Sequence, residues 1–130
     1  MPHETMPQEQ PAVRVTAVPA DANVYGDIFG GWLMSQMDLG ASSVASRHAG
    51  GRAVTVAVEG MAFHRPVFIG DEVSVFARLI KVGRTSMSVE VEAWARDRHS
   101  DAANKVTQAV FAFVAVGQDR RPRAVRGLVA

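Results

Sequence analysis

The sequence predicts an α+β fold, in which a mostly antiparallel sheet of five strands wraps around one long helix. Two observations predict it. A single stretch has the apolar spacing of a helix, and five other stretches alternate or are rich in β-forming residues. The order is one strand, the helix and then four strands, which is typical of an α+β layout. The chain of 130 residues fits one domain.

The expected elements begin with a polar segment and a short strand. Residues 1–11 carry three prolines and are expected to be disordered, outside a folded domain of residues 12–117. A strand is expected over residues 12–18, where Val13, Val15 and Ala17 share one face. Pro19 ends this strand, and a loop of turn-forming residues follows it.

A helix is expected from Gly31 to His48. At about 100° per residue, Leu33, Met37 and Ala41 fall on one apolar arc, while serines occupy the opposite arc. Asp38 falls at the boundary between the two. Glycines at 50 and 51 end the helix.

The rest of the chain is predicted to form strands, followed by a tail. Strands are expected over residues 53–64, 71–82, 85–97 and 104–116, and residues 118–130 form a basic tail expected to be loosely held. Phe76, Trp94 and Phe111 cannot all face one helix. In addition, the unpaired edge of a sheet can form hydrogen bonds with another chain. We therefore expect at least a dimer.

Composition excludes several classes of function. The formal net charge is +1, so no global field favours nucleic acid or a membrane. There is no cysteine, and the four histidines follow no metal-binding spacing, so we expect no metal site. The N-terminus lacks the pattern of a signal peptide, and we expect a cytoplasmic protein.

A glycine-rich turn, "GDIFGG", precedes the helix. The N–H groups at a helix start are unpaired, and Gly30 and Gly31 let a ligand approach them. Such a site can bind an anion or stabilise the oxyanion that forms at an attacked carbonyl. The alternative is a plain turn whose glycines serve tight packing.

An acid inside the helix is the second candidate. Asp38 lies about two turns past the start, too far to be a cap, and could act as general base or nucleophile. It could equally be a solvated boundary residue. Asp27 could cap the helix or the preceding turn, and the amide of Asn23 could form a turn or orient a water.

Charged residues near the expected turns are weaker candidates. Glu59 and His64 lie on either side of "GMAF", and each could face a site or solvent. Arg65 and Arg84 could bind phosphate groups if their loops surround the glycine-lined turn. Each could also serve solubility alone.

Three segments together resemble a known family. "NVYGDIFGGWLMSQMD", "FHRPVFIGDEV" and "KVGRTSMSVEVE" are similar, in order and spacing, to segments of the hotdog-fold acyl-CoA thioester hydrolases, of the bacterial YciA type and the brain type. The resemblance covers roughly residues 12–116. It implies a hotdog fold, with a curved antiparallel sheet around a central helix.

The resemblance also implies an activity and an assembly. Acyl-CoA would be hydrolysed to free CoA and a carboxylic acid, with no cofactor beyond the CoA of the substrate. The site would lie between the two chains of a homodimer, often assembled as a hexameric trimer of dimers. The family places the catalytic acid at Asp38 and the carbonyl-polarising turn at Phe29 to Gly31, with Asn23 and Asp27 on the same loop. Residues expected near the CoA moiety are Arg84, Thr85 and Ser86.

Two other functions stay open for the same fold. A hydratase or dehydratase would pair a histidine with an acid on the helix, but the only histidine of the expected helix is His48 at its end. A non-catalytic acyl-CoA binding or sensing domain would need the pocket but not the acid. Release of CoA thiol would distinguish the hydrolase from the sensor.

Overall fold

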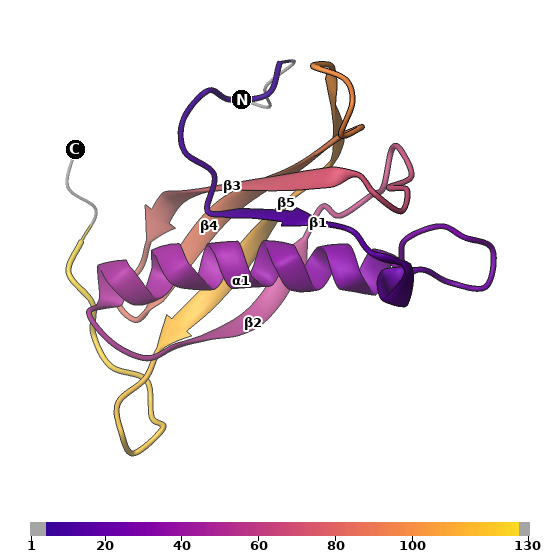
Figure 1. Ribbon diagram of the computed structural model, residues 1–130. Coiled ribbons are helices and arrows are strands. Elements are labelled where there is room, and N and C mark those ends of the chain that lie inside the picture. Colours follow the sequence, from indigo (N-terminus) through magenta and orange to yellow (C-terminus); the bar gives the residue numbers. More distant parts are fainter. Residues whose placement is uncertain (1–4, 128–130) are drawn as a thin grey trace.

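A computed structural model describes residues 5–127 of the chain. Five strands, one short 3-10 helix and one long α-helix make up the fold (Figure 1). In chain order they are β1 (Val13–Thr16), η1 (Pro19–Asp21), α1 (Gly30–Ala49), β2 (Ala53–Glu59), β3 (Glu72–Val82), β4 (Ser86–Arg96) and β5 (Ala103–Ala115). The expected α+β class and the order of its elements are therefore confirmed.

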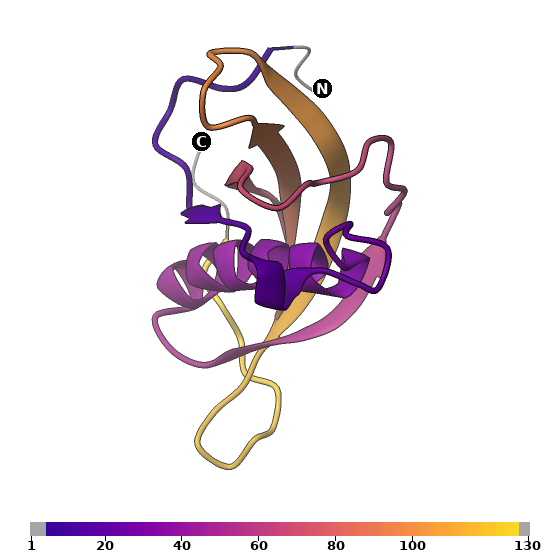
Figure 2. The ribbon, with the colours of Figure 1, turned by 45° about the vertical axis from the view of Figure 1, so that its right-hand side comes forward.

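The strands form one antiparallel sheet in the order β1-β3-β4-β5-β2. The sheet curves around α1, which lies between the two edge strands and contacts all five strands (Figures 1 and 2). This half-barrel around a helix is the hotdog fold. Because β2 is an edge strand, one side of it has no partner strand among residues 5–127.

The core lies between the helix and the concave face of the sheet. The expected apolar arc of α1 is buried, with Leu33, Met37 and Ala41 at most 2% exposed. Gly40 allows close packing against β1 and β3, because a Cβ there would meet Val75 at 3.0 Å and Ala12 at 3.2 Å. Side chains of β3, β4 and β5 complete this core.

Part of the convex face of the sheet lies next to the chain's own N-terminal segment. Residues 5–11, part of the segment expected to be disordered, line a pocket together with Arg14 of β1 and residues 101–103. Pro7 is buried there, and Glu9 lines a crevice with Phe76. Phe76 and Trp94 are buried on this face, whereas Phe111 points into the core. Of the three aromatic residues that suggested a second chain, Phe111 belongs to the core, and residues 1–4 lie outside the described part.

The tail also packs against the domain over residues 118–127, although it was expected to be loosely held. Arg123 donates to the carbonyls of Ala49 and Val116, and Val125 N–H donates to the carbonyl of Arg84. Figure 1 shows this segment, in yellow, returning beside the C-terminal end of α1. The tail thus joins the end of the helix to the β3–β4 hairpin.

Strand β2 ends earlier than expected. It stops at Glu59 because Gly60 adopts a left-handed backbone, with φ of 74°. A register shift between Thr55 and Ala57 leaves Val56 as an extra residue opposite β5. No helix in the described part of the chain is long and apolar enough to cross a membrane.

Candidate active site

The helix start leaves two backbone donors without partners. Phe29 precedes α1 and makes no side-chain cap, while the N–H groups of Trp32 and Leu33 donate to the Phe29 carbonyl. Within residues 5–127, the N–H groups of Gly30 and Gly31 have no acceptor. A Cβ on Gly31 would meet nothing within 4 Å, so the space above these donors is open. The helix dipole adds positive potential there.

The loop before the helix is held by Asn23. Its Oδ1 accepts hydrogen bonds from Tyr25 N–H at 2.9 Å and Asp27 N–H at 3.1 Å. Asn23 is therefore a turn former, with its side-chain NH₂ left available. Asp27 does not cap the helix, and its backbone instead forms a bridge with Phe68.

Asp38 is held by a residue that the sequence did not indicate. The hydroxyl of Thr55, on edge strand β2, donates to Oδ1 of Asp38 at 2.6 Å. Asp38 is only partly buried and Thr55 is exposed in the single chain. One carboxylate oxygen is thus fixed, and the other can meet water or a substrate.

A pocket of about 200 Å³ adjoins the helix start. It brings together Phe29, Gly30 and Arg65, three residues that the sequence had singled out, with apolar side chains such as Leu33 and Phe63. Its wall is mostly apolar, and the guanidinium of Arg65 adds one positive charge. It can therefore take an apolar group whose polar end faces Arg65 or the glycine N–H groups.

The other predicted residues lie elsewhere on the domain. Arg84 and Thr85 lie in the β3–β4 turn, and Ser86 begins β4, near the C-terminal end of α1. The backbone carbonyl of Thr85 accepts from Ala115 N–H. Glu59 is exposed at the end of β2, and the backbone N–H of His64 donates to Val106. In the part of the chain that the structure describes, no group of three acidic or histidine side chains could hold a metal ion.

Open donors at a helix start and an acid on the same helix are groups that attack on an activated carbonyl requires. Residues 25–102 match the family model described as the thioesterase superfamily. The acyl-CoA thioester hydrolase YciA of Salmonella typhimurium is 49% identical over 123 residues, covering 92% of each chain.

Solved structures agree with this match. The hexameric thioesterase y2039 from Yersinia pestis has a TM-score of 0.87 and 45% identity, covering 95% of this chain and all of its own. An aspartate-to-alanine mutant of HI0827, a hexameric broad specificity acyl-coenzyme A thioesterase, has a TM-score of 0.85 and 44% identity, covering 89% of this chain and 86% of its own. The chain belongs to the thioesterase superfamily, and it is an enzyme that hydrolyses thioester bonds.

Proposed function

We propose that the protein hydrolyses acyl-CoA to free CoA and a carboxylic acid, with Asp38 as the catalytic carboxylate. The observation that carries this proposal is the hydrogen bond from Thr55 to Asp38, on the same helix as the open N–H groups of Gly30 and Gly31. The names of the relatives support the substrate class, and the aspartate mutant of one relative supports a role for an aspartate.

The glycine N–H groups would polarise the thioester carbonyl. Negative charge builds on this oxygen when the carbonyl is attacked, and preorganised backbone donors stabilise it without reorganising. The open space at Gly31 leaves room for the substrate to approach. Asn23, through its available NH₂ group, lies on the same loop and can orient the substrate or a water.

Asp38 can act in two ways. As general base it takes a proton from a water that attacks the carbonyl, and the tetrahedral intermediate then expels the CoA thiolate. As nucleophile its free oxygen attacks directly, expels the thiolate and forms an anhydride that water hydrolyses. In both cases the Thr55 hydroxyl fixes one oxygen of Asp38 and leaves the other directed at the reaction.

The donor and the acid of one chain are too far apart to serve the same carbonyl. Gly31 and Asp38 are seven residues apart on α1, which is about 10 Å along the helix axis. A reacting carbonyl must lie about 3 Å from both groups. The site therefore combines the helix start of one chain with Asp38 of a second chain.

Edge strand β2 is where the second chain would pair. It is exposed along nearly its whole length and carries Val54, Val56 and Val58, which are 41%, 58% and 36% exposed. Antiparallel pairing of two β2 strands would bring the two helices together in opposite directions. The homodimer is then the minimal active unit, and the hexameric relatives favour three such dimers in a hexamer.

The remaining predicted residues would hold the rest of the substrate. Phe29 and Arg65 line the pocket at the helix start, while Arg84, Thr85 and Ser86 lie at the far end of the helix, where the phosphates of CoA could be bound. Glu59, at the end of β2, would adjoin the partner chain. The cytoplasmic location and the lack of a cofactor remain predictions from the sequence.

Thiol release from a panel of short to long acyl-CoAs, with wild type and Asp38→Asn side by side, tests the proposal. We expect the mutant to lose roughly two or more orders of magnitude in turnover while keeping its fold, because its amide can neither accept the proton nor attack. Near-normal turnover in the folded mutant would move the catalytic role elsewhere. Binding without release by wild type would instead favour an acyl-CoA sensing domain.

A further inference from the structure

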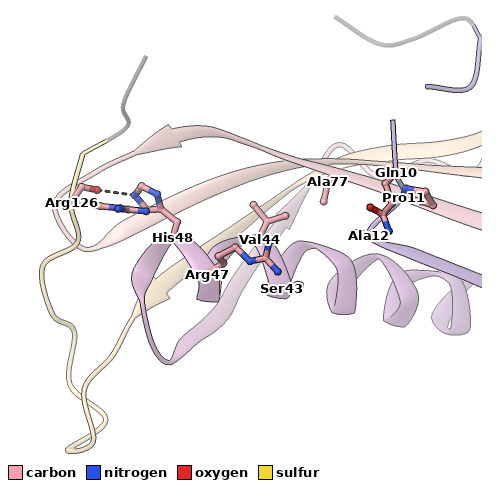
Figure 3. A pocket seen from close by; sticks show the side chains of 9 residues that line it. All are labelled: Gln10, Pro11, Ala12, Ser43, Val44, Arg47, His48, Ala77 and Arg126. Carbon is pink, nitrogen blue, oxygen red and sulfur yellow. Dashed lines mark hydrogen bonds between the residues drawn. The ribbon is translucent and has the colours of Figure 1, made fainter. Parts of the chain in front are cut away.

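A second and larger pocket, of about 520 Å³, lies beside the C-terminal half of α1. Figure 3 shows its wall: side chains of α1 on one side, residues of the N-terminal segment and Ala77 of β3 on the other, and Arg126 of the tail at one end. The volume is within the range of small-molecule sites. None of its lining residues has a part in the proposed hydrolysis.

This pocket faces away from Asp38. Arg47 is nine residues beyond Asp38, and at about 100° per residue it points to the opposite side of the helix. Asp38 faces Thr55 on edge strand β2, whereas the pocket opens beside β3 and residues 10–12 next to β1. A ligand here would share no side chain with the thioester site of the same chain.

The charged side chains that line the pocket are all positive. Arg47 and Arg126 line it, with no carboxylate among the lining residues. Neither guanidinium forms an ion pair or side-chain hydrogen bond within residues 5–127. The hydroxyl of Ser43 and the amide of Gln10 add neutral hydrogen-bonding groups.

The helix end does not account for these cations. A helix C-terminus is equivalent to about half a negative charge. Arg123 already donates to the carbonyl of Ala49 at 2.6 Å, and Gly50 N–H bonds back to the last turn. Arg47 and Arg126 therefore leave an excess of positive charge, which concentrates anions in a concave site.

Arg126 is held in place at the pocket. The ring Nε2 of His48 donates to the backbone carbonyl of Arg126 at 2.8 Å, since a carbonyl can only accept. The preceding residue, Val125, donates its N–H to the carbonyl of Arg84 at 2.9 Å. Figure 3 shows the guanidinium of Arg126 beside the His48 ring and that of Arg47 extending along the helix toward Ser43.

We propose that this pocket binds a phosphorylated small molecule at a site separate from the thioester site. Its phosphate groups lie between Arg47 and Arg126, where guanidinium forks can make paired hydrogen bonds to phosphate oxygens. The rest of the ligand packs against Pro11, Val44 and Ala77. The proposal does not depend on the hydrolytic activity.

Calorimetric titration of the full chain with inorganic pyrophosphate, at low ionic strength, tests this site. We expect saturable binding, one per chain, that weakens about tenfold or more in Arg47→Ala and in Arg126→Ala, because a hydrogen bond to a charged group is lost. The matched control is Arg98→Ala, in the β4–β5 turn, which removes the same charge away from the pocket. The Arg98→Ala variant should bind pyrophosphate as tightly as wild type does.

Three results would overturn the proposal. The first is no saturable binding to the wild type, and the second is equal weakening by Arg98→Ala, which would mean unspecific attraction. The third is loss of pyrophosphate binding when CoA saturates the protein, which would make the pocket part of the CoA site. Succinate, which has the same kind of charge without phosphate geometry, should bind at least tenfold more weakly.

Discussion

At the scale of single residues, the interaction of Asp38 with Thr55 joins the helix to the edge strand. Asp38 was identifiable in the sequence because an acid at the border of an apolar helix face is unusual. Thr55 was not, because it lies 17 residues away on a strand whose register a one-residue bulge changes. Local patterns predict an element's face, but a bulge becomes visible only when two strands pair.

Thr55→Val should lower kcat about tenfold or more while KM changes little, because the carboxylate loses the donor that orients it. Valine keeps the β-branched shape and suits the strand. Thr55→Ser, which restores a hydroxyl, should recover most of the activity. If Thr55→Val and Thr55→Ser behave alike in steady-state thiol release, the hydroxyl has no positioning role.

At the scale of elements, the sequence predicted the helix to within a residue at each end and predicted every strand of the sheet. The alternation of apolar residues in a strand and the glycines after a helix are local features of the sequence. They therefore predict an element without any knowledge of its distant contacts. The structure of the N-terminal segment and that of the tail were not predicted from the sequence. Glu9 of the N-terminal segment lines a crevice with Phe76, and Arg123 of the tail donates to the carbonyl of Ala49 at the end of α1. Interactions between residues so far apart in the chain leave no periodic pattern in the sequence.

Glu72 ties three strands together near one end of the sheet. Its carboxylate accepts from Arg96 of β4 at 2.8 Å and lies 3.8 Å from Arg14 of β1. The hydrogen bond from Arg96, aided by the charges of both arginines, lowers the pKa of Glu72 from its usual 4.5. Its contribution to stability is therefore fully present above pH 4.5 and disappears as the pH falls through the lowered pKa.

Glu72→Gln should accordingly unfold at lower urea than wild type at pH 7, and the difference should shrink as the pH falls below 4.5 and through the lowered pKa of Glu72. The comparison needs one fixed protein concentration, since assembly adds to stability. A difference that stays equally large from pH 7 down to acidic pH would mean that packing, and not the charge of Glu72, is responsible.

At the scale of the whole molecule, a site shared between chains can be tested by mixing two inactive variants. Asp38→Asn removes the acid, and Gly31→Pro removes one N–H donor at a first-turn position where proline is tolerated. Each variant alone should be nearly inactive. Random mixing should restore about one quarter of wild-type activity, because that fraction of sites pairs a normal acid with a normal donor.

Recovery on mixing requires that chains exchange, so the mixture should be unfolded in urea and refolded together. Wild type treated in the same way sets the reference. If the refolded mixture stays as inactive as its components, each chain supplies both groups by itself, and the distance between Gly31 and Asp38 must be bridged in another way.

The extra residue in β2 determines which single-codon deletions or insertions the strand can accept. Thr55 pairs with Phe113 and Val58 with Phe111, and both phenylalanines face the core, so Thr55 and Val58 face the helix although they are three positions apart. Only the additional Val56 makes this possible. An in-frame loss of that one codon would place Thr55 and Val58 two positions apart, and ordinary alternation would then keep both facing the helix with the same partners on β5. A further codon inserted between them would instead turn one of the two to the far side of the sheet.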